Sequence, residues 1–341
     1  MLRDLQLRNF RCFEAFAADF SPGFNFIVGP NGQGKTTLLE AACVLLRLQS
    51  QRSSSLAPAV RVGQRSFVLS GHAGDHLLQF YYSPLRRKLA FDGQEQRDQA
   101  EYLRLVKVVS FANHDLDLIR GSAETRRRYL DFIGTQTDAR YRPALRAYER
   151  ALRSRNALLK SPLPRPRELA AYTEPLVRAG TLLRAIREEI VRRLAPLAAA
   201  SQRAISGGLE SLTLEYAAGS EPDFAAHLER ARPEEARFRL TTVGPHRDDL
   251  RLLVAALPAA QFTSEGQQRT IALALKLAQA QIFAEEADAP PLLLIDDIFG
   301  ELDPARRNAL LAHLPNESQK LVTSTALDWR TGEWEGPVLQ L

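Results

Sequence analysis

Residues 29–36 read Gly-Pro-Asn-Gly-Gln-Gly-Lys-Thr, which matches the phosphate-binding pattern G-x-x-x-x-G-K-[ST] at every fixed position. Residues 24–28 before it predict a short buried strand, and the residues from Thr36 onward predict a helix. Backbone N–H groups and a helix N-terminus can then bind a phosphate, while glycines keep side chains away. We expect Lys35 to reach the β and γ phosphates and the Thr36 hydroxyl to bind Mg²⁺. The predicted nucleotide-binding residues are Gly29, Pro30, Asn31, Gly32, Gln33, Gly34, Lys35, Thr36 and Thr37.

The composition is that of a globular α/β protein with a basic surplus. The chain has 341 residues, 45% of them hydrophobic, a formal net charge of +5 and a pI of about 9.3. This surplus favours an anionic partner. With only Cys12 and Cys43, an apolar-poor N-terminus and no apolar run of membrane length, we expect a cytoplasmic protein without a disulfide framework or a membrane partner.

Strand-like and helical stretches alternate in three blocks. Short strands are predicted up to about residue 111, and strands return from residue 211, including 211–216, 237–243, 250–253, 292–295 and 321–325. Between them, apolar residues at helical spacing predict one helix over about 143–159 and another over 169–197, joined by a proline-rich turn at 161–166. We therefore expect a nucleotide-binding head of residues 1–114 and 206–341, interrupted by a helical hairpin arm of residues 115–205.

A second set of residues is predicted to complete the nucleotide site. The apolar strand 292–295 ends on Asp296 and Asp297; Asp296 is placed to hold Mg²⁺, and Asp297 to orient or deprotonate the attacking water. Ser264-Glu-Gly-Gln-Gln268, which we call the signature segment, opens a helix and offers a hydroxyl and backbone N–H groups to an anion. Taken singly, each motif is also compatible with an ordinary helix cap.

Together these motifs resemble the ABC-type ATPases. In that superfamily the signature segment of one subunit covers the γ-phosphate bound by another. The resemblance therefore implies an ATP-driven homodimer in which Ser264, Gly266 and Gln267 contact nucleotide across the interface. It also implies that Asp303, in Glu301-Leu-Asp303, lies in the loop that crosses that interface.

The order of segments is similar to that of the RecF family, the bacterial recombination and gap-repair ATPases. The segments that carry this resemblance are Leu7-Arg-Asn-Phe-Arg11, the phosphate loop, Ile119-Arg-Gly-Ser122, Arg126-Arg-Arg-Tyr-Leu-Asp131, Arg153-Ser-Arg-Asn-Ala-Leu-Leu-Lys160, Gly244-Pro-His-Arg-Asp-Asp249 and the signature segment. Two departures matter. Asn113 stands in the region where related ATPases place a magnesium-sensing glutamine, and Thr323-Ser-Thr325 replaces the switch histidine of transporters. The absence of the switch histidine, together with Asp297 in place of the longer glutamate of transporters, implies slow ATP hydrolysis.

Basic residues concentrate in the arm and predict a DNA-binding surface. Arginine neutralises phosphates without reading base sequence, and the alternative is a solvated helix face. The candidates are Arg127, Arg128, Arg142, Arg146, Arg150 and Arg153; for Arg127 and Arg128 the alternative is that they brace the arm. We assign no chemistry to His246, whose neighbours Arg247 and Asp248 are typical of a structural histidine.

The resemblance implies a weak, DNA-stimulated ATPase of recombinational repair, replication and the SOS damage response. It implies binding to duplex or gapped DNA, recombination mediators of the RecR and RecO type as partners, and help in loading a recombinase onto single strands. The rival predictions are the ATP-binding subunit of an ABC transporter and another SMC-like ATPase. The basic helical insertion disfavours the first, and the short predicted hairpin disfavours the second.

Overall fold

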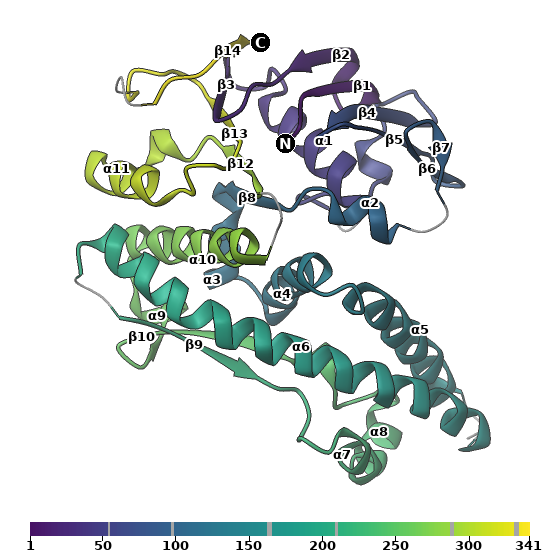
Figure 1. Ribbon diagram of the computed structural model, residues 1–341. Coiled ribbons are helices and arrows are strands. Elements are labelled where there is room, and N and C mark those ends of the chain that lie inside the picture. The colour runs from purple at the N-terminus through teal and green to yellow at the C-terminus, as the bar shows by residue number, and fades with distance from the viewer. Residues whose placement is uncertain (54, 97–98, 162–165, 209–210, 287–289, 331–333) are drawn as a thin grey trace. The chain divides into compact units, whose positions relative to one another are not determined.

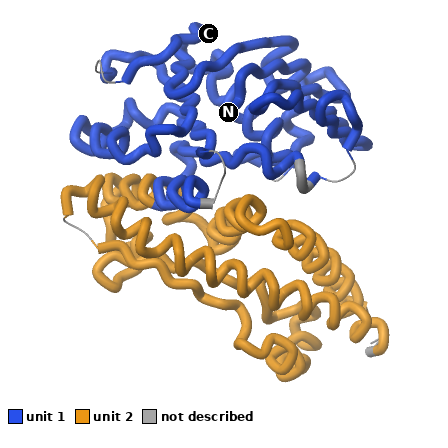
Figure 2. The backbone as a smooth tube through the Cα atoms, in the orientation of Figure 1, with its two compact units in different colours: residues 1–115, 275–341 blue, residues 116–274 orange. Residues whose placement is uncertain are grey.

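The chain divides into two compact units. The computed structural model describes all residues except 54, 97–98, 162–165, 209–210, 287–289 and 331–333. One unit contains residues 1–115 and 275–341, and the other contains residues 116–274 (Figure 2). The second unit is larger than the predicted arm, 115–205. Residues 206–274 belong to it because their strands form a separate sheet that contacts the long arm helix.

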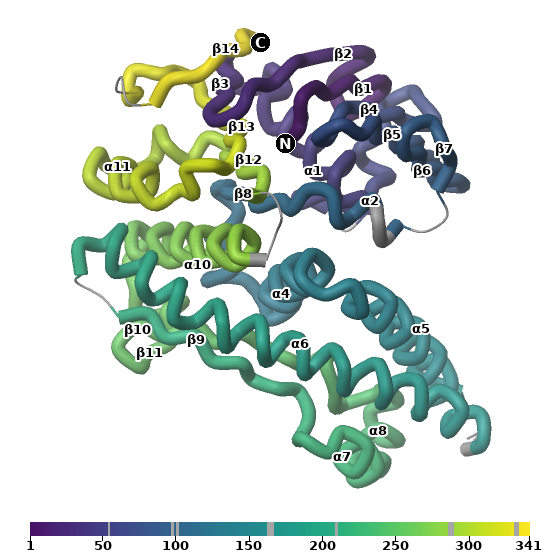
Figure 3. The backbone as a smooth tube through the Cα atoms, in the orientation of Figure 1, coloured from purple at the N-terminus to yellow at the C-terminus, as the bar shows by residue number. Residues whose placement is uncertain are grey.

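The first unit contains a parallel sheet of order β14-β3-β13-β12-β8. Its middle strands are runs of apolar residues because both faces of a parallel sheet are usually covered. Strands from the two ends of the sequence lie side by side in it (Figure 3). The carboxyl ends of β3, β12 and β13 therefore meet at one edge. The strands are β3 (Phe24–Val28), β8 (Val108–Ala112), β12 (Leu292–Asp296), β13 (Lys320–Ser324) and β14 (Val338–Gln340).

Helix α1 (Lys35–Arg47) lies between this sheet and an antiparallel sheet of order β2-β1-β4-β5-β6-β7 (Figure 1). Its side chains are buried on nearly every side, because it contacts strands of both sheets. The antiparallel strands are β1 (Asp4–Phe10), β2 (Phe13–Asp19), β4 (Phe67–Ala73), β5 (His76–Tyr82), β6 (Arg87–Phe91) and β7 (Gln94–Glu95). Helices α2 (Ala100–Arg104) and α11 (Pro304–His313) complete the described part of the unit, together with the second half of α10 (Glu265–Glu286).

The second unit is built around the helix pair α5 (Tyr141–Lys160) and α6 (Pro166–Ser206). The predicted apolar seam of α6 is buried at Leu176, Leu183, Ile190 and Leu194, and the helix continues through Pro175 and Pro196. Strand β9 (Leu212–Ala217) packs against α6 and pairs with β10 (Asp249–Val254), which pairs with β11 (Leu257–Pro258). The shorter helices are α3 (Asp117–Arg120), α4 (Ala123–Thr137), α7 (Phe224–Arg230), α8 (Arg232–Phe238) and α9 (Ala259–Phe262).

Two local predictions were wrong. Residues 237–243 do not form a strand: helix α8 ends at Phe238, and Arg239 has a φ of 54°. Pro233 and two glutamates start that helix, which suits proline and acidic residues at a helix N-terminus. Helix α5 begins at Tyr141, not at Pro143, which the first turn tolerates because its N–H groups need no helical partner. Most of the predicted turn 161–166 lies outside the described residues.

Within the described ranges, no helix is both long enough and apolar enough to span a bilayer.

Candidate nucleotide and DNA sites

The phosphate loop joins β3 to α1 as predicted. Gly32 and Gly34 have φ angles of 87° and 100°, a region that residues with a Cβ rarely adopt. A Cβ on Gly34 would lie 2.6 Å from the Phe13 ring, so glycine is also required there by close packing. The Lys35 ammonium is buried and donates to the carbonyl oxygens of Gly29 (2.5 Å) and Pro30 (2.9 Å). The loop thus holds a positive charge at the start of α1.

The carboxyl edge of the parallel sheet brings Thr36 and Asp296 together across 260 positions of sequence. The Thr36 hydroxyl donates to Asp296 Oδ1 at 2.8 Å, and the Thr323 hydroxyl donates to the same oxygen at 2.7 Å. Hydroxyl and carboxylate oxygens, with the oxygens of a bound phosphate, are the ligands Mg²⁺ prefers. The donor set therefore fits a magnesium triphosphate, with Lys35 as the neighbouring cation.

Asp297 follows directly and has a left-handed backbone, with a φ of 51°. Its N–H donates to the Thr323 hydroxyl at 3.0 Å, which fixes the residue at the sheet edge. Burial raises the pKa of the Asp297 carboxyl above its ordinary value; nearby Lys35 opposes the shift, and the negative charges of Asp296 and Glu301 add to it. A carboxylate that is costly to ionise is a stronger proton acceptor, which suits a general base.

A cavity of about 510 Å³ connects these groups. It is lined by Arg11, Cys12, Asn31, Gly32, Gly34, Lys35, Thr36, Thr37, Arg52, Pro58, Val60, Val62, Asp296 and Asp297. This lining contains most of the predicted phosphate-loop residues and both acids. It also contains a basic wall and an apolar wall that the motifs did not indicate.

The basic wall is organised by Glu40, which is 2% exposed. Its two oxygens accept from Arg11 Nε (3.0 Å) and Nη2 (2.7 Å), while Arg52 lies 3.6 Å away. A buried carboxylate needs such partners because an unpaired charge is costly inside a protein. The acidic residue in an apolar stretch of α1 was the signal for a nearby arginine, but the sequence did not say which one.

The apolar wall comes from the loop of Pro58, Val60 and Val62. Backbone bonds from Arg11 N–H to Ala59 O (2.8 Å) and from Arg61 N–H to Asn9 O (2.9 Å) attach this loop to the end of β1. The cavity therefore has a cationic and acidic end around Lys35 and an apolar end that could accept a nucleobase.

The signature segment lies in the other unit, at the start of α10. The Ser264 N–H donates to Gln267 Oε1 (2.7 Å), and the Gln267 N–H donates to Ser264 Oγ (3.3 Å), which is a reciprocal helix cap. Ser264 is exposed, and Gly266 lies in the first turn. The described lining of the cavity includes none of Ser264, Gly266 and Gln267.

Two further predicted residues have local partners. Asp303 caps α11 by accepting the Arg306 N–H at 2.9 Å. Asn113 donates its amide to Glu301 Oε1 at 2.6 Å, so in this structure it contacts an acid. Neither residue lines the cavity among the described positions.

The arm arginines fall into two groups. Arg146, Arg150 and Arg153 are exposed on one face of α5, with Arg142 half-buried one turn earlier. Arg128 is also exposed and pairs with Glu124. Arg127 instead donates to the Asp248 carbonyl at 2.8 Å, and burial lowers the pKa of its guanidinium. Of the six candidates, Arg127 therefore has the role of a brace in this unit.

Comparison with known proteins places the chain in a family. The model described as RecF/RecN/SMC N terminal domain matches residues 1–329. Proteins named DNA replication and repair protein RecF are similar to it: that of Symbiobacterium thermophilum is 39% identical over 98% of this chain and 94% of its own length, and that of Gloeobacter violaceus is 36% identical over 98% and 94%. The chain belongs to the RecF family.

Solved structures of RecF relatives agree with this fold. Two structures of the recombination mediator protein RecF in the RecFOR pathway, described as RecF-ATPrS and RecF-ATP, both match with a TM-score of 0.88. They are 27% and 28% identical and cover 100% and 98% of this chain, and 96% and 93% of their own. An Smc head bound to a winged-helix domain of ScpA matches with a TM-score of 0.53 at 17% identity, which shows a shared fold alone.

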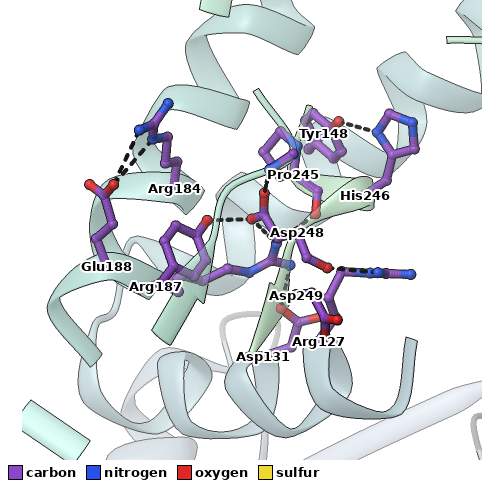
Figure 4. A network of polar contacts seen from close by, with 12 residues as sticks. Arg127, Asp131, Tyr148, Arg184, Arg187, Glu188, Pro245, His246, Asp248 and Asp249 are labelled. Atoms are coloured by element: carbon purple, nitrogen blue, oxygen red, sulfur yellow. Dashed lines mark hydrogen bonds and ion pairs between the residues drawn. The ribbon is translucent and has the colours of Figure 1, made fainter. Parts of the chain in front are cut away.

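A buried ionic network in this RecF-family chain was not predicted (Figure 4). Arg187, 2% exposed, donates at 2.7 Å to Asp131, to Asp248 and to the Pro245 carbonyl, and at 2.8 Å to the Tyr141 hydroxyl. It thereby joins α4, α5, α6 and the start of β10. The one local signal was its phase, since Arg187 lies four residues after Leu183 and three before Ile190 on the buried stripe of α6. The sequence did not reveal its partners, which lie 46 to 61 positions away.

His246 belongs to the same network of polar contacts and is structural (Figure 4). Its Nδ1 lies 2.7 Å from the Tyr148 hydroxyl, and its Nε2 lies 2.9 Å from the Thr241 carbonyl. Since a carbonyl can only accept, Nε2 carries the proton and Nδ1 accepts from Tyr148. Burial lowers the pKa of His246 to about 4 and keeps the ring neutral.

Proposed function

We propose that this RecF-family chain is an ATP-dependent DNA-binding protein of recombinational repair, and that ATP closes two copies into a homodimer. The observation that carries the ATP site is the hydrogen bond between Thr36 and Asp296 beside Lys35, because it unites two motifs far apart in sequence. The related structures described as RecF-ATP and RecF-ATPrS support ATP as the nucleotide.

The roles of the residues follow from their positions. With nucleotide bound, Lys35 would exchange its two carbonyl partners for phosphate oxygens, and Thr36 and Asp296 would hold Mg²⁺. Asp297 accepts a proton from the attacking water, and its short side chain reaches less far than a glutamate, so hydrolysis is slow. Hydrolysis of the bond between the β and γ phosphates of bound ATP would then open the dimer. Ser264 and Gly266 of a second copy cover the γ-phosphate, with Asp303 near the dimer interface.

Arginines of the arm hold the DNA backbone. The exposed side chains of Arg146, Arg150 and Arg153 follow one face of α5, and Arg128 and Arg142 extend the basic surface. Backbone contacts of this kind bind DNA without sequence preference. The names of the relatives, a DNA replication and repair protein and a recombination mediator protein in the RecFOR pathway, support a repair role. Within that role we propose DNA-stimulated hydrolysis, a preference for gapped or junction DNA, mediators of the RecR and RecO type as partners, and help in loading a recombinase.

Sedimentation velocity tests this proposal directly. The chain is sedimented with and without ATP and Mg²⁺, and with a fluorescent gapped duplex. We expect a monomer without ATP, a dimer with ATP, and co-sedimentation of the duplex only with the dimer. A monomer under all conditions, or duplex binding that ignores ATP, would contradict it.

The variant Lys35→Arg tests the assigned role of the phosphate-loop lysine. The larger, planar guanidinium cannot place its charge where the Lys35 ammonium would meet the γ-phosphate, so we expect nucleotide binding to persist while the rate of phosphate release falls by about 100-fold. Lys88→Arg, a surface lysine paired with Glu95, is the matched control. Unchanged turnover in Lys35→Arg would refute the role.

A further inference from the structure

We propose that Arg120 is a positioning residue for Ser264, and that it connects the signature segment to arm helix α4 so that the two move as one rigid body. The inference rests on the proposed ATP-driven dimer and adds to it the residue that presents the signature serine. Arg120 ends α3, and its guanidinium contacts the first turn of α10.

The contact of Arg120 with Gln268 is the central observation. Arg120 Nε donates to Gln268 Oε1 at 2.5 Å, and Gln268 is 5% exposed. The amide nitrogen of Gln268 donates to the carbonyl oxygens of Thr263 (3.1 Å) and Ala260 (3.5 Å). One buried glutamine therefore fixes the backbone that leads into Ser264, and Arg120 fixes the orientation of that glutamine.

A second contact places charge at the same turn. Arg120 Nη2 lies 3.4 Å from Glu265 Oε2, in the residue that follows Ser264. Glu265 also lies 3.2 Å from Arg269, so the acid is held from two sides. Arg120 thus contacts two side chains of the signature segment, the buried amide of Gln268 and the exposed carboxylate of Glu265.

The other end of the connection is α4. Arg126 donates to the carbonyl oxygen of Gly121, directly after Arg120, at 2.8 Å. The same guanidinium makes a two-bond contact with Asp249 at 2.6 and 3.0 Å. Such paired bonds restrict geometry more than a single contact does. Strand β10, helix α4, the end of α3 and the signature segment are therefore linked by consecutive polar contacts within one unit.

The consequence concerns dimer closure rather than nucleotide capture. The loop before Ser264 is already ordered by these contacts, so closure does not have to order it. Without Arg120, the loop would have to be ordered when the second copy binds. ATP binding by the separate cavity around Lys35 would be unaffected, since neither Arg120 nor Gln268 lines it.

The test compares Arg120→Ala, Arg120→Lys and the control Arg192→Ala, an exposed arginine that pairs with Glu189 on α6. Fluorescent ATP titration, thermal melting and ATP-dependent sedimentation are measured for each. For Arg120→Ala we expect ATP affinity within about twofold of the parent, but an ATP-driven dimer at least about tenfold weaker. Arg120→Lys keeps the charge near Glu265 and should recover part of the loss, and Arg192→Ala should match the parent.

The outcomes separate this inference from the proposed function. If the parent chain does not dimerise with ATP, the proposed function fails. If the parent dimerises and Arg120→Ala dimerises equally well, the positioning role alone is overturned. A loss of ATP affinity equal to the loss of dimer would also overturn it, because Arg120 would then act through general stability. Because Arg120 is 43% exposed, the variant is expected to fold, and melting verifies this.

Discussion

At the scale of single residues, the properties of the nucleotide site depend on how deeply each charged side chain is buried and on which groups it contacts. Lys35 is buried with two carbonyls, Asp296 receives two hydroxyls, and Asp297 is half-buried with a raised pKa. The raised pKa has a consequence for stability as well as for chemistry, because the folded protein disfavours the ionised form of Asp297.

Replacing Asp297 with asparagine should stabilise the protein at neutral pH. A carboxyl whose folded pKa is raised contributes stability below its unfolded pKa, and that contribution is lost as pH rises through the folded pKa. Asparagine removes the cost of the charge and tolerates a φ of 51°. We expect the melting temperature at pH 8 to rise by about 1–3 °C, and the gain to shrink towards pH 5.

The control for Asp297→Asn is a variant whose stability should change in the opposite direction. A hydrogen bond from Arg140 lowers the pKa of Asp138, so Asp138→Asn should destabilise the protein at pH 8, with less effect as pH falls. Equal changes for both variants, or a pH-independent gain for Asp297→Asn, would contradict the charge argument. Phosphate release should fall in Asp297→Asn whatever its stability.

At the scale of elements, the helical phase of α5 places some arginines on the exposed face, where DNA could bind, and others on the buried face, where they stabilise the fold. The buried positions are Tyr141, Ala144, Tyr148, Ala151 and Arg155, and their spacing of three or four puts Arg155 on the core face. Arg153, two positions earlier, lies on the exposed face at 69% exposure. Only Arg153 is among the DNA-binding candidates of the sequence analysis, and the phase of the buried stripe distinguishes it from Arg155.

Arg155→Ala should destabilise the arm unit strongly. Both Arg155 and Glu235 are 1% exposed and form two bonds of 2.6 Å, and Arg155 also donates to Thr241 at 2.7 Å. Removing one partner of a buried pair leaves an unpaired charge, so we expect a loss of about 3–5 kcal/mol in urea unfolding. Arg153→Ala, the surface control, should change stability by less than about 0.5 kcal/mol. Similar values for the two would disprove the assignment.

The triple variant Arg146→Ala, Arg150→Ala and Arg153→Ala should weaken DNA binding and flatten its salt dependence. Each lost phosphate contact reduces the slope of log affinity against log salt by about 0.9, so we expect a decrease of about 2–3. Fluorescence anisotropy with a duplex and ATP measures it. The control replaces Arg178, Arg192 and Arg232, three exposed arginines of the same unit, and makes the same change in net charge. If both triple variants lose the same DNA affinity, binding depends on net charge alone and the assignment of this face of α5 is wrong.

At the scale of the whole molecule, the nucleotide site and the signature segment belong to different compact units. The cavity around Lys35 is formed within the first unit, and the capped start of α10 lies in the second. Helix α10 passes from one unit into the other, so the chain connects the two directly.

Ser264→Arg should abolish the ATP-driven dimer while leaving ATP binding within about twofold of the parent. The large cation would block the close approach of a second copy at the γ-phosphate, but Ser264 does not line the described cavity of its own chain. Sedimentation with ATP measures the dimer, and Ser211→Arg, an exposed serine in the same unit, is the control. A normal dimer in Ser264→Arg would count against a shared site.

The sequence by itself determined the strand, glycine loop and helix around Lys35, the acidic end of β12 and the helical seam of α6. These depend on hydrogen bonds and periodicity within a few residues, which a local pattern contains. Only the tertiary structure decided that Thr36 meets Asp296, that Glu40 holds Arg11 at the cavity, and that Arg187 is an ionic centre. Those partners are distant in the chain, and an arginine is exposed or buried according to which partners the fold brings to it.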